Sequence, residues 1–347
     1  MAGEVIRNTS LSRRTLLTGA AAGAVGLAVG WPFGAQPARA ASFINGADVS
    51  WAQQMMANGY TWKNASGTTE NLFTILAGYG INAIRLRTWV NPSTDPVNGH
   101  CSIDETAAMA VLAKDAGMSV LIDFHFGDTW NSVGVQNPPA AWASMTYSET
   151  LTAMYNYVYH SMNVLKYNGI SPEWVQIGNE INTGICHPIG SISYPTQMTG
   201  LLNAAYDMVK EVSSSSQVLI HLAQPQNYTS IEDFFSAYSA NGGQWDMSAF
   251  SSYGSAADAP GIVANMAKIA AAYDKPFMQV EFGGPVSNPG STESSLEAYI
   301  TQLKATGGQG IFYWEPEVYA PFDTWDETAW NASTLEPTII MNGFETA

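Results

Sequence analysis

Short apolar runs alternate with longer segments in which apolar residues recur at a helical spacing, from residue 43 almost to the end of the chain. Runs of the first kind predict buried strands, and segments of the second kind predict amphipathic helices. We expect strands at residues 43–49, 83–88, 119–124, 174–177, 218–222, 248–252, 277–280 and 310–313. We expect helices at residues 71–79, 103–116, 149–167, 196–212, 231–240, 262–273 and 294–305.

Strands interleaved with helices in this manner are typical of a single-domain α/β fold, the (β/α)8 TIM barrel. A doubly wound open sheet is the competing architecture. It is disfavoured because no Gly-x-Gly-x-x-Gly turn follows the first predicted strand and no Walker-type phosphate loop occurs. In a barrel the loops after the strands form the reactive face, and here those loops are rich in Trp, Asn, Asp and His.

Residues 1–40 are predicted to be a leader and not part of the fold. The pair Arg13 and Arg14 is followed by a small-residue apolar stretch and by an A-x-A cleavage site that ends at Ala40. This is the pattern of a twin-arginine signal peptide. A membrane anchor is the alternative, but the apolar stretch is short and broken by glycine. We therefore expect a secreted protein whose folded domain is residues 41–347.

The chain is acidic, with 29 acidic and 13 basic residues and a formal net charge of −16. The predicted leader holds more basic than acidic residues, so its removal makes the protein still more acidic. Such a surface repels nucleic acid and anionic membranes, and neither is an expected partner. A neutral substrate is compatible with this charge. The aromatic residues, 11 tryptophans among them, can simply indicate a large core, but several lie in loops rich in Gly, Pro and Asn, where stacking on sugar rings is the usual function.

Cys101 and Cys186 are the two cysteines of the chain, and both follow predicted strands. Exported proteins commonly contain disulfides, but sequence alone does not give the distance between two cysteines. Whether these two residues are joined stays open at this point.

Two predicted strands lead to a glutamate: residues 174–177 run on to Glu180, and residues 277–280 run on to Glu281. A carboxylate at the mouth of a buried strand costs free energy unless it has partners or a chemical role. Either glutamate alone is explained as well by a turn cap or a structural ion pair. Two of them at one end of a barrel favour a catalytic pair that hydrolyses a glycosidic bond.

Three polar residues lie close to this pair in the predicted topology. Asn179 directly precedes Glu180, which places its amide within reach of a sugar hydroxyl. Arg85 and Arg87 are alternate residues of one strand, so both face the same side and could keep a nucleophilic carboxylate ionised. The alternative is that the two arginines form an internal salt-bridge layer.

Six segments in chain order carry a resemblance to a known family. They are Gly46-Ala47-Asp48-Val49-Ser50, Ile84-Arg85-Leu86-Arg87-Thr88-Trp89-Val90-Asn91-Pro92, Ile122-Asp123-Phe124-His125-Phe126-Gly127-Asp128-Thr129-Trp130, Ile177-Gly178-Asn179-Glu180-Ile181, Ile220-His221-Leu222 and Tyr313-Trp314-Glu315-Pro316. Together they resemble the endo-β-1,4-galactanases of glycoside hydrolase family 53, which belong to a large clan of retaining (β/α)8 glycosidases. The resemblance covers nearly the whole predicted mature chain.

The resemblance implies a role for each candidate residue. Glu180 would be the general acid/base and Glu281 the nucleophile, while Trp314 would form the stacking floor under the reacting sugar. The other residues implied to line this subsite are Asn179, Arg85, His125 and Tyr253, and Asp128 and Trp130 would contact neighbouring sugars.

The chain departs from the family pattern at three strand ends. Ala223 stands where an acid is expected after the fifth strand. Residues 251–255 hold fewer aromatic and proline residues than expected, and residues 282–285 lack the expected threonine and bulky residue after Glu281. These departures leave the catalytic pair intact and concern the outer subsites.

No cofactor is expected. Asp123, His125 and His221 lie at predicted strand ends, as ligands do in metal-dependent barrel hydrolases, but those sites usually contain a His-x-His pair. The chain has five histidines and no such pair, so we expect no catalytic metal. A structural calcium on loop carboxylates such as Asp323 and Asp326 stays open.

These observations predict a secreted endo-glycosidase that hydrolyses internal β-1,4 bonds of galactan or arabinogalactan. The polysaccharide is its expected partner, and we expect a monomer. One alternative is the same chemistry on another β-linked polysaccharide, such as mannan or glucan. The other is a non-catalytic polysaccharide-binding barrel, which is disfavoured because both glutamates and Asn179 are present.

Overall fold

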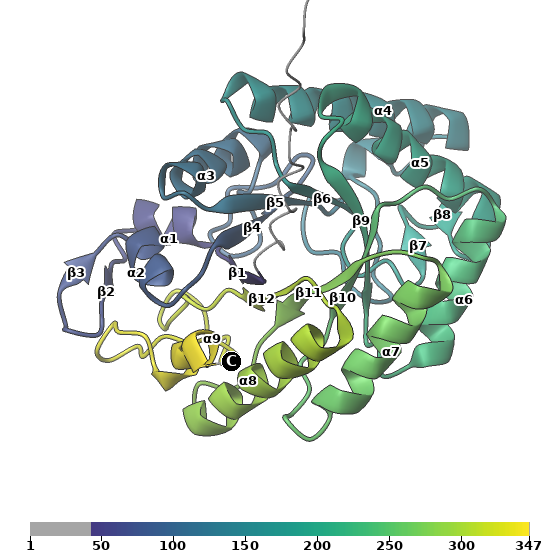
Figure 1. The fold of residues 1–347 in the computed structure, drawn as a ribbon. Helices are drawn as coiled ribbons and strands as arrows, with labels where there is room; N and C mark the ends of the chain where they lie inside the picture. Colours follow the sequence, from purple (N-terminus) through teal and green to yellow (C-terminus); the bar gives the residue numbers. More distant parts are fainter. Residues whose placement is uncertain (1–42, 347) are drawn as a thin grey trace, which may run out of the picture. The chain divides into compact units, whose positions relative to one another are not determined.

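The structure, a computed structural model, describes residues 43–346; the predicted leader lies outside this range. Within it, eight parallel strands close into a barrel in the order β1-β12-β11-β10-β9-β6-β5-β4 (Figure 1). The strands are β1 (Ile44–Asp48), β4 (Ala83–Thr88), β5 (Ser119–Phe124), β6 (Trp174–Ile177), β9 (Gln217–Ala223), β10 (Met247–Ser251), β11 (Phe277–Phe282) and β12 (Gly310–Trp314). The predicted (β/α)8 barrel is confirmed.

Helices follow the barrel strands and pack around their outer side (Figure 1). They are α1 (Ala52–Ala57), α2 (Leu72–Gly78), α3 (Ile103–Asp115), α4 (Tyr147–Tyr167), α5 (Pro195–Val212), α6 (Tyr228–Ala240), α7 (Ala259–Ala272), α8 (Pro289–Thr306) and the short α9 (Gly343–Thr346). Two hairpins, β2 (Trp62–Lys63) with β3 (Thr69–Glu70) and β7 (Gly184–Ile185) with β8 (Gly190–Ser191), were not predicted.

The helix boundaries follow from local chemistry. Ser102 and Thr146 cap α3 and α4: each hydroxyl accepts the N–H of a glutamate three residues on, and that carboxylate accepts the cap's own N–H. The predicted start of α8 at residue 294 was too late, because α8 begins at Pro289. Proline next to glycine predicts a loop, yet proline is favoured at the first helical position, where no N–H is needed.

The inside of the barrel is divided into an apolar and a polar half. Near the amino ends of the strands, Leu121, Trp174 and Phe312 belong to an apolar cluster enclosed by the barrel. Gly46 leaves the space that the Phe312 ring fills, since a Cβ at residue 46 would lie 2.2 Å from that ring. Towards the carboxyl ends the inward-facing residues become charged, and Arg85 is only 1% exposed. Polar groups are therefore gathered at the end where the loops lie.

An irregularity in β11 determines how its glutamate is presented. Phe250 of β10 pairs with Gln279, but the next residue, Ser251, pairs with Glu281, so Val280 is an extra residue on β11. Bulges of this kind turn side chains and are frequent beside active sites. Here the extra residue leaves Val280 in the apolar barrel interior and brings Glu281 to the polar end.

The cysteine question is answered by the structure. Cys101 and Cys186 are separate free thiols, both buried. The Sγ of Cys101 contacts the carbonyl oxygen of Ser50 at 3.7 Å, whereas that of Cys186 contacts the carbonyl oxygen of Phe126 at 3.8 Å. Burial raises the pKa of both thiols to about 12, which keeps them protonated and unreactive at neutral pH.

Between residues 43 and 346, none of the helices combines the length and the apolar character needed to cross a bilayer.

Candidate active site

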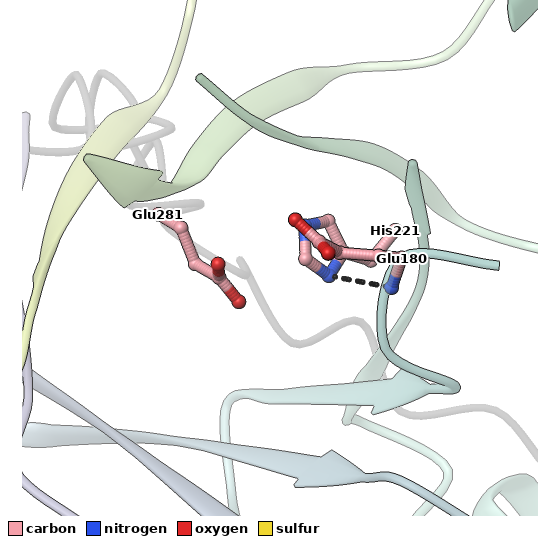
Figure 2. A group of neighbouring side chains, drawn as sticks. All are labelled: Glu180, His221 and Glu281. Carbon is pink, nitrogen blue, oxygen red and sulfur yellow. Dashed lines mark hydrogen bonds between the residues drawn. The ribbon is translucent and has the colours of Figure 1, made fainter. Parts of the chain in front are cut away.

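The two predicted glutamates meet at the carboxyl end of the barrel. One carboxylate oxygen each of Glu180 and Glu281 and one ring nitrogen of His221 all lie within 4.8 Å of one another. Figure 2 shows the two carboxyl groups pointing towards each other, with the imidazole of His221 beside Glu180. Residues 101 positions apart in the sequence are thus brought together by closure of the barrel.

Glu180 lies in a sharp turn after β6. Its backbone φ is 49°, a left-handed conformation that is unusual for a residue other than glycine. Gly178 has a φ of 108°, and a Cβ there would lie 2.5 Å from the side chain of Ile181. The turn therefore depends on glycine at position 178, and it directs Glu180 across the barrel mouth.

The carboxylate of Glu180 is partly buried and accepts two hydrogen bonds. The Ser251 hydroxyl donates to Oε1 at 2.6 Å, and the Val133 backbone N–H donates to Oε2 at 3.4 Å. The backbone N–H of Glu180 donates to Nδ1 of His221 at 3.3 Å, as drawn in Figure 2. Burial and the nearby Arg85 keep the pKa of His221 well below its usual range, so this ring is neutral and able to accept.

Glu281 is more deeply buried, with 5% of the residue exposed, and it has stronger partners. Nη2 of Arg85 lies 2.8 Å from Oε1, and the Tyr253 hydroxyl donates to Oε2 at 3.0 Å. Burial is the main reason that the pKa of Glu281 is raised to about 8, and repulsion from Glu180, Asp123 and Asp48 raises it further. Arg85 lowers this pKa, but its effect is smaller than that of burial and repulsion together. The negative charge of Glu180 thus favours the protonated form of Glu281.

Arg85 is the centre of the polar half of the barrel. Besides Glu281, its guanidinium pairs with Asp48 at 2.7 Å and Asp123 at 2.8 Å, and it donates to Oδ1 of Asn179 at 3.0 Å. Burial alone would lower the pKa of Arg85, but the three carboxylates raise it above its ordinary value. One positive charge thus faces three acids, which leaves the group with an excess of negative charge.

Arg87 has a different environment from Arg85, although both belong to β4. Its guanidinium pairs with the buried Glu315 and lies over the rings of Trp51, Trp89 and Trp130, with the nearest centroid at 4.4 Å. Such cation–π contacts fix the orientation of aromatic rings. Arg87 therefore supports an aromatic cluster at the barrel mouth, and it also lines the cavity that contains both glutamates.

That cavity, which we call the donor cavity, has a volume of about 410 Å³. Its aromatic wall consists of Trp130, Trp314 and Trp325, and Trp314 makes edge-on contacts with the other two. Besides Trp130 and Trp314, the sequence predicted six substrate-binding residues. Five of them line this cavity: Asn179, Arg85, Arg87, His125 and Tyr253. A single sugar ring fits a space of this size and chemistry, with flat aromatic faces and hydrogen-bonding groups.

His125 and Asp128 differ in what they contact. Nε2 of His125 lies 3.0 Å from Asp123, and its Nδ1 accepts the N–H of Asn131, so the ring is fixed at the cavity wall. Asp128 lines neither this cavity nor the larger one beside Glu180. Its two oxygens accept backbone N–H groups of Asn91 and Ala140 and so join two loops. Both oxygens of Asp128 thus have a structural role, and the expected contact of Asp128 with a neighbouring sugar stays a prediction.

Four residues of the site were not among the sequence candidates for catalysis or substrate binding: Asp48, Asp123, His221 and Ser251. Asp48 and Asp123 could have been found, since each is a charged residue at an inward-facing position in the same strand register as Arg85 or Arg87. Nothing in the sequence distinguishes Ser251 from other serines at strand ends.

Glu180, His221 and Glu281 also form the one group of three or more potential metal ligands found among the described residues. Two carboxylates and an imidazole suit a divalent cation. Arg85 and Tyr253 already occupy the oxygens of Glu281, however, and a cation would lie next to the guanidinium. The donor set is therefore better suited to proton and glycosyl transfer, and the absence of a catalytic metal and the question of a structural calcium stay predictions.

Comparison with known proteins identifies the family. The profile of glycosyl hydrolase family 53 matches residues 44–297. The chain belongs to glycosyl hydrolase family 53. It is therefore a glycoside hydrolase, as the sequence resemblance predicted.

Relatives of this family 53 hydrolase cover most of its length. A probable arabinogalactan endo-β-1,4-galactanase A of Aspergillus terreus is 30% identical over 334 residues, which are 88% of this chain and 92% of that protein. The arabinogalactan endo-β-1,4-galactanase A of Aspergillus niger is 32% identical over 305 residues, covering 80% and 86% of the two chains. The solved family 53 catalytic domain of Ignisphaera aggregans is 28% identical, with a TM-score of 0.81 and coverage of 89% and 97%.

Glu281 predicts an unusual pH dependence of stability for this family 53 hydrolase. Its folded-state pKa of about 8 lies above the ordinary value of 4.5, so the folded state binds this proton more tightly than the unfolded state. The stability contributed by the protonated group is complete below pH 4.5 and is lost as the pH rises to about 8. We expect Glu281→Gln to raise the free energy of unfolding at pH 8 by a few kcal/mol (~2–4), and by much less at pH 4.5.

Thermal and urea unfolding of both proteins at pH 4.5, 6 and 8 would measure this difference. Glu211→Gln, at an exposed position of α5, removes the same charge from the surface and should not change the pH dependence. A Glu281→Gln variant that is less stable than the wild type at pH 8 would contradict the sign of the effect.

Proposed function

We propose that this family 53 hydrolase is an exported endo-β-1,4-galactanase that works by double displacement, with Glu180 as acid/base and Glu281 as nucleophile. The observation that carries the proposal is the separation of the two carboxyl groups, whose nearest oxygens lie within 4.8 Å. Retaining glycosidases hold their carboxyl groups about 5–5.5 Å apart, whereas inverting enzymes need about 6.5–9.5 Å to admit a water molecule.

The partners of each glutamate support this division of roles. Arg85 can only donate, so its contact with Glu281 favours the ionised form of that carboxyl, as a nucleophile requires. Ser251 can donate or accept, so its contact with Glu180 tolerates a proton on that carboxyl. In this division of roles, Glu180 supplies the proton and Glu281 is the carboxylate that attacks.

The reaction proceeds in two steps, formation of a glycosyl ester and its hydrolysis. A galactose ring stacks on Trp314 in the donor cavity, and Glu281 attacks its anomeric carbon while Glu180 donates its proton to the leaving oxygen. The bond to the leaving sugar breaks, and an ester forms between Glu281 and the ring. Water then attacks the same carbon, gives one proton to Glu180 and releases Glu281 as the carboxylate.

The change in charge on Glu281 explains how one residue serves as acid and then as base. In the first step Glu281 carries the negative charge, and Glu180 supplies the proton that the leaving oxygen takes up. In the ester the negative charge of Glu281 is gone, and Glu180 then accepts a proton from the attacking water. The short distance between the two carboxyl groups lets both act on the same sugar ring.

Substituting each glutamate in turn tests these roles. With galactan, Glu180→Gln should lower kcat by about 10²–10⁴-fold through loss of general acid catalysis, and Glu281→Gln should abolish turnover. With an aryl β-galactobioside whose leaving group needs no proton, Glu180→Gln should still release one equivalent of phenol in a rapid burst, whereas Glu281→Gln should show no burst. A burst from Glu281→Gln, or near wild-type kcat for Glu180→Gln on galactan, would contradict the assignment. Circular dichroism verifies that both variants fold.

The names of the relatives support galactan as the substrate, because the Aspergillus proteins are arabinogalactan endo-β-1,4-galactanases. We expect reducing ends to appear with galactan and arabinogalactan and to be at least ten-fold fewer with mannan and cellulose. Product size separates internal from terminal cleavage, since an endo-acting enzyme first produces oligosaccharides of several lengths. A preference for mannan or glucan would keep the mechanism and overturn the substrate.

Export is part of the proposal and rests on the sequence alone, through the pair Arg13 and Arg14 and the site that ends at Ala40. In a host with the twin-arginine pathway, we expect the secreted protein to begin at Ala41. Replacement of both arginines by lysine should retain the protein inside the cell, as immunoblots of cell and medium fractions would measure. Secretion of the double variant at the wild-type level would contradict this route.

A further inference from the structure

A second cavity adjoins the donor cavity at Glu180. It has a volume of about 980 Å³, and we call it the acceptor cavity. Ser132, Glu180 and Tyr253 line both cavities, whereas Glu281 lines only the donor cavity. Glu180 thus stands at the boundary between a space that contains both carboxyl groups and a space that borders the proposed acid alone.

The proposed mechanism assigns a chemical role to each space. The nucleophile bonds to the donor sugar, whereas the acid gives its proton to the oxygen that departs with the other part of the chain. The cavity that borders Glu180 without Glu281 therefore receives the leaving group. This step rests on the proposed function.

The two cavities have different walls. The donor cavity is lined by three tryptophans, but Tyr253 is the one aromatic residue that lines the acceptor cavity. Small residues from three elements leave the acceptor cavity wide: Ala223 ends β9, Gly254 follows β10 and Gly261 lies on α7. A Cβ built on Gly261 would have no heavy atom within 4 Å, so this side of the cavity is open.

Amide groups line this space together with serine hydroxyls and the carboxylate of Asp258. Gln224 and Gln226 follow β9 on its rim, and the side chain of Gln226 is exposed. Each amide offers both donors and acceptors, which suits sugar hydroxyls presented in more than one orientation. Residues 223–226 and 251–254 belong to the segments in which the sequence departs from the family pattern, so two of those departures shape this cavity.

We infer that the acceptor side of this enzyme binds a leaving-group sugar that carries a branch, while the donor side requires an unbranched ring. The acceptor cavity has more than twice the volume of the donor cavity, which accommodates the reacting ring. A linear chain would be guided along one track by stacked rings, but this space is wide, polar and bounded from β9, β10 and α7. The substrate class is β-1,4-galactan bearing single-sugar side groups, cut where the leaving residue is substituted.

Defined oligosaccharides test this asymmetry directly. Three β-1,4-galacto-oligosaccharides of equal backbone length are needed: one linear, one with a pentose branch on the residue after the cleaved bond, and one with the same branch on the residue before it. Mass spectrometry of the products identifies the bond that is cut. We expect kcat/KM for the acceptor-branched substrate within three-fold of the linear one, and a loss of at least 100-fold for the donor-branched substrate.

Filling the acceptor cavity should prevent binding of a branched leaving-group sugar. Gly261→Phe projects a ring into the cavity from α7 and should lower kcat/KM on the acceptor-branched substrate at least ten-fold, whereas Gly261→Ala should change it less than two-fold. On the aryl β-galactobioside, whose small leaving group does not need the space, the loss for Gly261→Phe should be smaller than on the acceptor-branched substrate. Gly290→Phe is the matched control, because Gly290 also follows proline in the first turn of a helix, α8, and lines neither cavity.

The outcomes separate this inference from the proposed function. Cleavage of the linear substrate together with a ten-fold or greater loss on the acceptor-branched one would overturn the inference and leave the galactanase intact. Equal activity of Gly261→Phe and the wild type on all three substrates would also overturn it. No cleavage of any of the three would overturn the proposed function and the inference with it. Thermal unfolding verifies that the Gly261 variants are folded.

Discussion

The buried guanidinium of Arg85 is the group on which the active site depends. It contacts carboxylates contributed by three other barrel strands, Asp48 on β1, Asp123 on β5 and Glu281 on β11, each at 2.7–2.8 Å. A buried carboxylate without a cationic partner would take up a proton or destabilise the fold. Because these acids reach one cation from separate strands, closure of the barrel and assembly of the site are the same event.

The cost of this arrangement is an excess of negative charge in a buried space. One cation faces three acids, and Glu180 brings a fourth within 4.8 Å of Glu281. Burial, together with repulsion from the neighbouring carboxylates, raises the pKa of Glu281 to about 8. This excess of negative charge destabilises the folded protein, but it also includes the carboxylate nucleophile that the proposed double displacement needs. This matches the general observation that active sites are less stable than the rest of a fold.

The two cavities at the barrel mouth have different walls. On the donor side, Arg87 and Glu315 hold an aromatic cluster that includes Trp130, and Trp314 packs against it. Stacked aromatic rings offer a defined surface for one sugar ring and little freedom. On the acceptor side, the small residues Ala223 and Gly261 leave the cavity wide, and amide side chains line it where tryptophans line the donor cavity. The proposed selectivity, strict at the reacting ring and tolerant of a branch beyond it, rests on these two different kinds of wall around Glu180.

The sequence by itself determined the barrel and drew attention to the two glutamates that we propose as the acid pair. Strand positions follow from apolar runs that had to be buried, and Glu180 and Glu281 stood out because each ends such a run. Tertiary structure decided what depends on distances between separate strands: the sharing of Arg85 by three acids, the free state of Cys101 and the structural role of Asp128. It also decided the volumes of the two cavities. Local patterns record which residues are buried, but the partner of a buried charge is set by how the barrel closes.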